Sequence, residues 1–383
     1  MRRTVRVVLG ALVVAHGGVH LLGAAAGLGW TSTSELEVTT VGGWAWLAVA
    51  AITVAAGTAL LAGRPRWWQL GAVAAAGSLA LVATHWPAPA PALLPDAALL
   101  LAVLHGWWCA SPRSLRGRYR TGVAASRDEP TPSSPVSDAD VDRLPPVVAR
   151  YVRRTGAVGR PRVSRVRVRL RGRIRGGPDE PWMTFTGEQV NTYGERPTRH
   201  FLLDATRAGL PIDVLHVLTD GTATMQARLL SVIPVVRGAG AEMDRGETVT
   251  LFNDLCLLAP AALVDAPVTW EELDDRRVRG TYRTGGQEVS AVLVVDAEGD
   301  LRDFVSDDRL RASPDGRSFT PMRWSTPVGG FAQSDGRRLA GSARALWHAP
   351  EPEGTFVYAE MELTDIVTDR PEPTSGRTTA RRA

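Results

Sequence analysis

Two histidines in the first apolar stretch are the residues whose type and spacing most clearly permit chemistry. His16 and His20 lie four residues apart, so a helix places both on one face. Ionisable side chains at membrane depth are costly and typically mark haem ligation, a quinone site or a proton relay. Under the opposing interpretation, neutral imidazoles form hydrogen bonds between helices, and Asp96 is the one acid of the spans that can pair with them. Both interpretations stay open on the sequence alone.

A second pair of polar residues interrupts an apolar run in the second half of the chain. Asn253 and Asp254 lie within TLFNDLCLLAP, a stretch predicted to be a helix that ends at Pro260. Asp244 and Glu247 precede it at the D-x-x-E spacing of an N-terminal capping box, which explains both acids without any acid–base chemistry. Asn253 and Asp254 have no such explanation, and they need polar partners if they are buried.

The motifs of the common enzyme classes are missing from the sequence. It has no G-x-S-x-G, no Walker A motif, no dinucleotide-binding glycine pattern, no H-E-x-x-H and no kinase set. The histidines of the second half are widely separated, and Cys109 and Cys256 form no CxxC or zinc pattern. No metal or other cofactor is therefore predicted. A non-enzymatic function is favoured, and an enzyme built on acids such as Glu188 or Asp254 stays a third hypothesis.

The histidine pair is positioned by one of four apolar stretches, each of which can cross a bilayer. About 20 apolar residues cover ~30 Å of hydrocarbon, and the stretches that qualify are residues 5–29, 41–63, 67–86 and, somewhat shorter, 92–108. Tryptophans cluster near their ends, where indole rings favour the headgroup layer. Residues 1–112 are therefore predicted to form a four-helix transmembrane bundle.

The arginines of the connections predict an orientation for these spans. Arg2 and Arg3 precede the first span, Arg64 and Arg66 lie in the second loop, and further arginines follow the fourth span up to Arg120. Because basic residues near span ends are retained in the cytoplasm, we expect both termini on the cytoplasmic side of a bacterial inner membrane. A cleaved signal peptide is the alternative for the first stretch, and the later arginines would still place the large domain inside.

Composition divides the remainder of the chain into three parts. Residues 113–142 are basic and then rich in Pro and Ser, which predicts a flexible linker, and residues 370–383 are polar enough to predict a disordered tail. Residues 143–369 form the predicted soluble domain, with alternating strands around one long helix. All basic residues are arginines and no patch interleaves them with aromatics, so nucleic acid is not a predicted partner.

The clearest strand of this domain, residues 165–175, has one cationic and one apolar face. Its cationic positions begin with Arg165, Arg167, Arg169 and Arg171. These arginines either face anionic headgroups at the membrane surface, at ~1 kcal/mol each, or pair with carboxylates of the last strand such as Glu362. The lysine-free composition favours the second, structural interpretation.

Four sequence blocks carry a resemblance to a known family. They are DGTATM at 220–225, RLLSVIPVV at 228–236, EMDRGETVTLFNDLCLLAPAAL at 242–263 and VVDAEGDL at 294–301. Together they resemble an uncharacterised bacterial family of β-rich domains that are often attached to membranes, a likeness that covers most of residues 143–369 and carries no assigned activity. At the level of fold, antiparallel strands with a helix packed across them are similar to the LolA/LolB type of lipoprotein carrier, a curved half-barrel that holds an acyl chain. Those carriers work outside the cytoplasm, whereas the arginines predict that this domain lies inside.

The resemblance implies an α+β domain dominated by a curved antiparallel sheet with a packed helix, and an apolar ligand face on its concave side. The residues expected there are Met225, Leu229, Val232, Phe252, Asn253, Asp254 and Leu255. The leading hypothesis is a multi-pass membrane protein whose β-rich domain binds a lipid or another hydrophobic ligand at the bilayer. The alternative is a redox or proton-handling membrane protein that uses His16 and His20, with the soluble domain in a regulatory role.

Overall fold

The computed structural model describes residues 3–31, 37–126 and 134–369. The chain divides into two compact units, Met1–Gly117 and Arg118–Ala383. The expected tail at 370–383, part of the expected linker at 127–133 and Arg2 lie outside the described residues. The expected borders near residues 112 and 142 stay a prediction, while Val136 and Val141 are buried in the core of the second unit.

The first unit contains long apolar helices where the sequence predicts spans. Its helices are α1 (Arg3–Gly27), α2 (Thr40–Leu61), α3 (Trp67–Thr84), the 3-10 turn η1 (Ala90–Ala92) and α4 (Leu93–Ala110). Within the described ranges, four helical stretches are long and apolar enough to cross a membrane. The four long helices that the hydropathy pattern predicts are thus confirmed, with bounds within a few residues of those expected.

Small residues let the first two helices approach each other closely. A Cβ atom added to Gly27 of α1 would lie 2.6 Å from the Cα atom of Gly43 in α2, so this crossing requires glycine. Close backbone contact of this kind drives helix association where lipid supplies no hydrophobic force. Large apolar side chains such as Leu22 and Leu94 are instead exposed, as expected for a surface that faces acyl chains.

The second unit begins with helices and continues as a long series of strands. The helices are α5 (Leu115–Ala125), which crosses the border between the units, α6 (Asp138–Asp142), α7 (Pro146–Arg154), α8 (Ala241–Leu258) and the 3-10 turn η2 (Pro260–Val264). The strands before α8 are β1 (Arg165–Ile174), β2 (Met183–Thr192), β3 (Thr198–Arg207), β4 (Leu210–Thr219), β5 (Thr222–Leu229) and β6 (Ile233–Ala239). Those after it are β7 (Val268–Glu272), β8 (Arg277–Thr284), β9 (Gln287–Val295), β10 (Leu301–Ser306), β11 (Leu310–Ala312), β12 (Phe319–Pro321), β13 (Trp324–Ser325), β14 (Val328–Ser334), β15 (Arg337–His348) and β16 (Thr355–Asp369).

One antiparallel sheet of the described residues joins both sets of strands. Its order is β6-β5-β4-β3-β2-β1-β16-β15-β13-β10-β9-β8-β7, with β14 pairing β15 at the side, while β11 and β12 form a separate hairpin. The first and last strands of the domain pair in the middle of the sheet, where Val168 of β1 lies opposite Ile366 of β16. The alternation predicted for residues 165–175 is present, because Val166, Val168 and Leu170 are buried between exposed or half-buried arginines.

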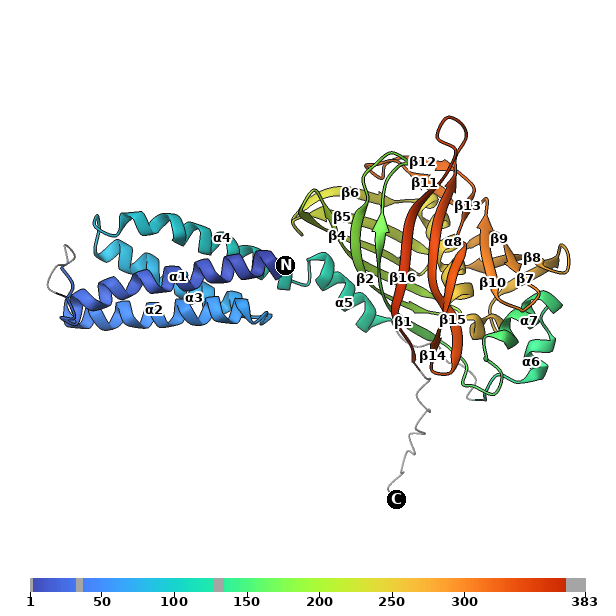
Figure 1. Cartoon of the computed structure of the whole chain (residues 1–383), viewed down its shortest axis with the longest axis horizontal. Helices are drawn as coiled ribbons and strands as arrows, with labels where there is room; N and C mark the ends of the chain where they lie inside the picture. The colour runs from blue at the N-terminus through green and yellow to red at the C-terminus, as the bar shows by residue number, and fades with distance from the viewer. Residues whose placement is uncertain (1–2, 32–36, 127–133, 370–383) are drawn as a thin grey trace, which may run out of the picture. The chain divides into compact units, whose positions relative to one another are not determined.

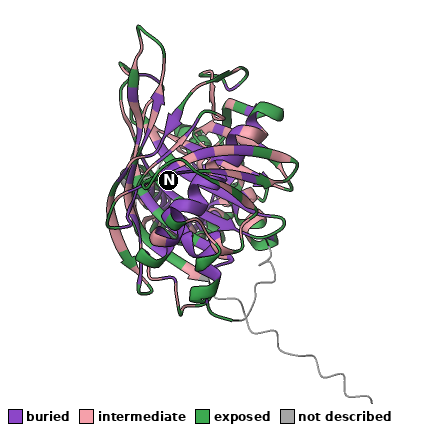
Figure 2. Ribbon diagram, turned by 90° about the vertical axis from the view of Figure 1, so that its right-hand side faces the viewer, coloured by how far each residue is buried: buried purple, intermediate pink, exposed green. Residues whose placement is uncertain are grey.

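The sheet curls around α8, which lies inside the curl between β4 to β6 on one side and β8 to β10 on the other (Figure 1). Its apolar side chains reach the second set of strands, since Phe252 stacks on Tyr282 of β8 and meets Phe304 of β10 edge to face. Figure 2 shows the buried residues gathered in the middle and the exposed ones at hairpin ends. The predicted curved antiparallel sheet with a packed helix is confirmed.

The N-terminus of α8 differs from the prediction. The helix starts at Ala241 after Gly240, whose φ of 104° suits glycine, so Asp244 and Glu247 already lie inside the helix and do not cap it. Asp244 instead accepts a hydrogen bond of 2.6 Å from the backbone N–H of Ala223 in β5. The capping interpretation of these acids is therefore wrong, and both bind groups outside the helix.

Candidate functional site

In the first unit, a buried acid–imidazole pair joins α1 to α4. The Nε2 atom of His16 lies 3.0 Å from Oδ1 of Asp96, and both side chains are almost fully buried. The ring of His20 meets that of His16 edge to face at 4.7 Å, and Trp46 of α2 follows at 5.5 Å. His85, just beyond α3, completes a row of rings at 5.7 Å from Trp46.

Several polar atoms of this group have unused hydrogen-bonding capacity. Among the described residues, Nδ1 of His16, both ring nitrogens of His20, Nε1 of Trp46 and Oδ2 of Asp96 are buried without a partner. Such atoms are expensive in an apolar setting. A carboxyl group hydrogen-bonded to an imidazole can share or pass on a proton, which is the chemistry that this arrangement supports most directly.

The arrangement of His16 and His20 gives less support to the binding of a metal or haem. Over the described part of the chain, no group of three or more His, Cys, Asp or Glu residues is arranged to hold a metal ion. One nitrogen of His16 is engaged by Asp96, and the ring of His20 packs against that of His16. The haem or quinone role of His16 and His20 stays a prediction.

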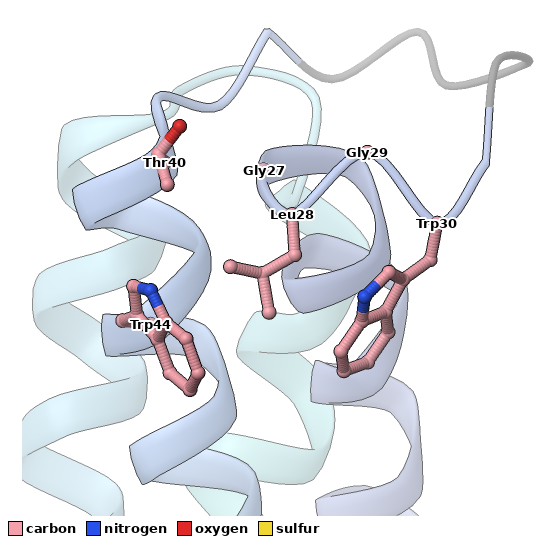
Figure 3. A pocket seen from close by; sticks show the side chains of 6 residues that line it. All are labelled: Gly27, Leu28, Gly29, Trp30, Thr40 and Trp44. Atoms are coloured by element: carbon pink, nitrogen blue, oxygen red, sulfur yellow. The ribbon is translucent and has the colours of Figure 1, made fainter.

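Two hollows lie on the surface of this unit. The first, of about 470 Å³, is at the end of α1 and the start of α2, where Leu28, Trp30 and Trp44 line it (Figure 3). Exposed tryptophans at span ends are typical of the headgroup layer. The second, of about 610 Å³, runs between α1 and α2 over apolar residues such as Leu21 and Val54. Both fit contact with lipid and hold no reactive group.

In the second unit, a buried network of charges ties α8 to the sheet. Arg199 of β3 donates from Nε to Oδ2 of Asp254 at 2.7 Å and from Nη1 to Oε2 of Glu247 at 2.9 Å. The side-chain amides of Gln189 and Asn191 in β2 donate to the same oxygen of Asp254, at 2.6 and 3.1 Å. All five side chains are buried, so the network lies inside the core.

Opposite charges keep the acid of this network ionised. Burial opposes ionisation of Glu247, yet His216, Arg199 and Arg309 together hold the pKa of its carboxyl group well below the usual value. Burial likewise acts against the charge of Arg199, and the attraction of Asp254 and Glu247 still raises its pKa. The network is therefore a set of mutually stabilised charges.

The network extends towards the exterior through His216 and Arg309. His216 of β4 lies 3.2 Å from Oε1 of Glu247, and Arg309, which precedes β11, lies 3.6 Å from the same oxygen. The guanidinium of Arg309 is 5.6 Å from the ring centroid of Trp324, and its Nε is buried without a partner within the described chain. A Cβ atom at Gly246 would lie 2.6 Å from Nη1 of Arg309, so glycine makes room for this cation. Arg309 is thus a largely buried cation beside an aromatic surface.

The residues predicted to form an apolar ligand face do not gather in one place. Phe252 and Leu255 are fully buried in the core, and Asp254 is held by the charge network. Asn253 accepts a hydrogen bond from Thr326. These four residues are therefore buried and in contact with other groups of the protein.

The three remaining residues of that predicted face lie on or beyond β5. Met225 is in register with His216, so it points to the same side of the sheet as the charge network, and Leu229, four residues on, shares that side. Both are partly exposed. Val232 lies in the turn between β5 and β6, where 44% of it is exposed. The ligand role of the whole set stays a prediction.

The arginine ladder of β1 is balanced by acids on neighbouring strands. Arg169 donates to Glu188 of β2 at 3.2 Å, and Arg171 donates twice to Glu362 of β16, at 3.0 and 2.9 Å. Arg165 donates to backbone carbonyl groups at the C-terminal end of α5, and Arg167 is exposed. This is the arrangement that the structural interpretation predicts, and a membrane-surface role for the ladder stays untested.

Sequence reasoning did not find Arg199, Gln189, His216 or Arg309. The period of β3 contained a usable signal, because Arg199 shares one face of the strand with Phe201 and Leu203, and all three are buried. A cation at a core position needs an acid nearby, and Asp254 was the acid left without an explanation. The pairing itself depends on how the sheet curls around α8.

The protein combines four long apolar helices with a domain in which a curled antiparallel sheet surrounds a buried helix. Residues 134–361, more than half of the chain, match a family of unknown function, DUF6544, and the chain belongs to that family. The expected membership in an uncharacterised family of β-rich domains is thereby confirmed. No curated protein matches the chain.

Solved structures of bacterial proteins match part of this chain. A domain of a putative outer membrane lipoprotein-sorting protein from Vibrio parahaemolyticus shares 9% identity, with 54% of this chain and 85% of that chain covered and a TM-score of 0.32. A DUF1329 family protein from Desulfovibrio piger shares 13% identity, with 62% and 94% covered and a TM-score of 0.35. A β-barrel-like DUF1849 protein from Brucella abortus shares 9% identity, with 55% and 99% covered and a TM-score of 0.23.

Proposed function

We propose that this protein is a membrane-anchored module whose β-rich domain binds a lipid or another hydrophobic ligand on the inner side of β4 and β5. The observation that carries the proposal is a set of apolar side chains that stay partly exposed on the side of the sheet that α8 occupies. They are Ile212, Val214, Met225 and Leu229, placed on one side by the pairing of β4 with β5. An acyl chain laid over them would remove apolar surface from water, at ~25 cal/mol per Å².

Polar groups next to this surface fit the headgroup of such a ligand. His216 is the direct cross-strand neighbour of Met225, and Arg309 reaches the same glutamate as His216. A guanidinium with an unused donor binds phosphate or carboxylate oxygens well. The proposed ligand is therefore an acyl chain with an anionic head, and the bilayer that holds α1 to α4 is its source. We place the domain and both termini on the cytoplasmic side, as the arginine distribution favours.

Photocrosslinking of the full-length protein in detergent tests this function. A phospholipid with a photoreactive acyl chain is added, and the crosslinked peptides are identified by mass spectrometry. We expect crosslinks in β4 and β5 that fall about tenfold in Leu229→Asp, because a charge on the apolar surface opposes burial. Thr224→Asp, on the opposite side of the same strand, is the matched control and is expected to retain them. Crosslinks confined to the spans would contradict the proposal.

A second candidate function rests on the buried pair of His16 and Asp96. We propose that the first unit takes up and releases a proton at this pair, with His20 as the next acceptor. Infrared difference spectra of the full-length protein between acidic and neutral pH are expected to show a carboxyl band that is lost in Asp96→Asn. The control is His105→Gln in the same helix, which leaves the pair intact. An unchanged band in Asp96→Asn would count against it, and a Soret band in the absorption spectrum would favour haem chemistry instead.

A further inference from the structure

One end of the β-sheet carries a cluster of exposed apolar side chains that the proposed ligand site does not use. These residues, which we call the apolar tip, are Leu210, Leu230, Val232, Ile233 and Val235, with exposed fractions of 47%, 40%, 44%, 49% and 43%. Leu210 begins β4, Leu230 and Val232 lie in the β5–β6 turn, and Ile233 and Val235 lie at the start of β6. The two hairpins are joined by a hydrogen bond of 2.9 Å from the N–H of Leu230 to the carbonyl of Pro211. Contiguous exposed apolar residues on a soluble surface typically mark a contact with a partner or a membrane.

The backbone of the β5–β6 turn holds this cluster in an unusual conformation. Leu230 and Ser231 have φ angles of 54° and 62°, in the left-handed region that residues other than glycine rarely adopt. Two such residues in succession form a tight turn. The turn keeps Val232 and Ile233 at the end of the hairpin, where 44% and 49% of their surface is exposed.

Arginines surround the base of the apolar tip. Arg228 precedes the turn and Arg237 follows it, and Arg118 of α5 binds Gln226, the cross-strand partner of Arg237. Burial and the repulsion of Arg118 and Arg237 lower the pKa of Arg228, against the attraction of Asp213. An apolar end with a cationic base is complementary to an anionic bilayer, where acyl chains lie beneath phosphate groups.

Helix α5, which follows the last predicted span along the chain, is attached to the strand that leads to the tip. Arg118 donates from Nη1 to Oε1 of Gln226 in β5 at 2.8 Å, which attaches α5 to the strand that leads to the tip. Helix α4 ends at Ala110. The residues from Ala110 to Arg118 form the covalent connection between α4 and this part of the β-domain.

We propose that the apolar tip inserts into the headgroup layer of the anionic leaflet that the spans cross, while Arg118, Arg228 and Arg237 contact lipid phosphates. The insertion would set the side of the β-domain that faces the bilayer. It is independent of whether the inner side of β4 and β5 holds a ligand, because the tip residues are separate from that surface.

Fluorescence of a labelled tip in vesicles tests the insertion. Ile233→Cys is made in full-length Cys109→Ser protein, in which Cys256 stays buried, and is labelled with an environment-sensitive dye. The protein is reconstituted into phosphatidylglycerol vesicles that contain a nitroxide-labelled lipid. The control label is at Leu273→Cys, an exposed apolar position between β7 and β8. Quenching is expected to be about twofold stronger at position 233, as for insertion of ~5–10 Å into the interface.

The arginines are tested by the same measurement. In phosphatidylcholine vesicles, and in protein that carries Arg228→Gln with Arg237→Gln, the excess quenching at position 233 is expected to fall several-fold, because each arginine contributes about fivefold near an anionic surface. Equal quenching at positions 233 and 273 would overturn the proposal. So would a dye response that depends on protein density and not on the nitroxide lipid, since that result would assign the tip to a second copy of the chain.

Discussion

Arg199 bridges Glu247 and Asp254 inside the core, and it is the residue on which the attachment of α8 to β3 most directly depends. The sequence offered no reason to connect these three residues, because 48 positions separate Arg199 from Glu247 along the chain. What the sequence did indicate was that Asp254 needs a polar partner if buried. The structure supplies three of them, Arg199, Gln189 and Asn191.

Removal of Arg199 is expected to be strongly destabilising. Arg199→Met leaves buried Asp254 without its cation and Glu247 with only His216 and Arg309, and breaking a buried pair in this way typically costs ~3–5 kcal/mol of unfolding free energy. Urea unfolding of the full-length protein in detergent measures the change. The matched control is Arg171→Met, which breaks an exposed pair with Glu362 and is expected to cost less than about 1 kcal/mol. Equal losses in the two variants would show that the network contributes no more than a surface pair.

His200 is expected to make the β-domain less stable in mild acid. Burial and the nearby cations Arg165 and Arg199 lower its pKa from 6.5 to about 4. Between these values the unfolded chain binds a proton that the folded chain does not, so stability falls as the pH decreases from 6.5 to 4, by up to ~1.4 kcal/mol per pH unit. His200→Gln is expected to flatten that part of a pH series of melting temperatures. An unchanged acid slope would show that other groups cause it.

Local sequence patterns predict where helix α8 ends, but they do not predict where it begins. Its existence and its end before Pro260 follow from the apolar run and the proline, whereas its start does not. The D-x-x-E spacing indicated a cap, but Gly240 can adopt the required left-handed conformation, so the helix begins earlier and takes both acids inside. Buried on nearly all sides, α8 occupies much of the inner side that the fold-level resemblance assigned to a ligand.

A substitution at Gly246 of α8 is expected to weaken ligand binding while the unfolding free energy changes little. In Gly246→Ala the new methyl group would displace the end of the Arg309 side chain, which is flexible, while alanine favours the helix by ~1 kcal/mol. We therefore expect an unfolding free energy within about 1 kcal/mol of wild type and a several-fold loss of lipid crosslinks to β4 and β5. A variant that keeps its crosslinks would remove Arg309 from the proposed headgroup contact.

Orientation in the membrane is the prediction that belongs to the whole molecule. Fusions of a fluorescent protein that matures only in the cytoplasm are expected to be bright at both termini, and fusions of alkaline phosphatase there are expected to be inactive. The reason for this expectation is that basic residues near span ends, here Arg64, Arg66 and the arginines after the fourth span, favour retention on the cytoplasmic side. An active phosphatase fused to the C-terminus would place the β-domain outside, and with it the apolar tip.

Elements whose causes are local could be predicted from the amino-acid sequence. Apolar length specifies the four helices of the first unit, alternation specifies β1, and the four sequence blocks specify the family. Contacts between residues far apart in the sequence, in contrast, could be identified only from the tertiary structure. Asp96 reaches His16 because α4 packs near α1, Arg199 reaches Asp254 because the sheet curls around α8, and Leu230 reaches Pro211 because two hairpins end side by side. Such meetings depend on the curvature of the sheet and on helix packing, which no short stretch of sequence encodes.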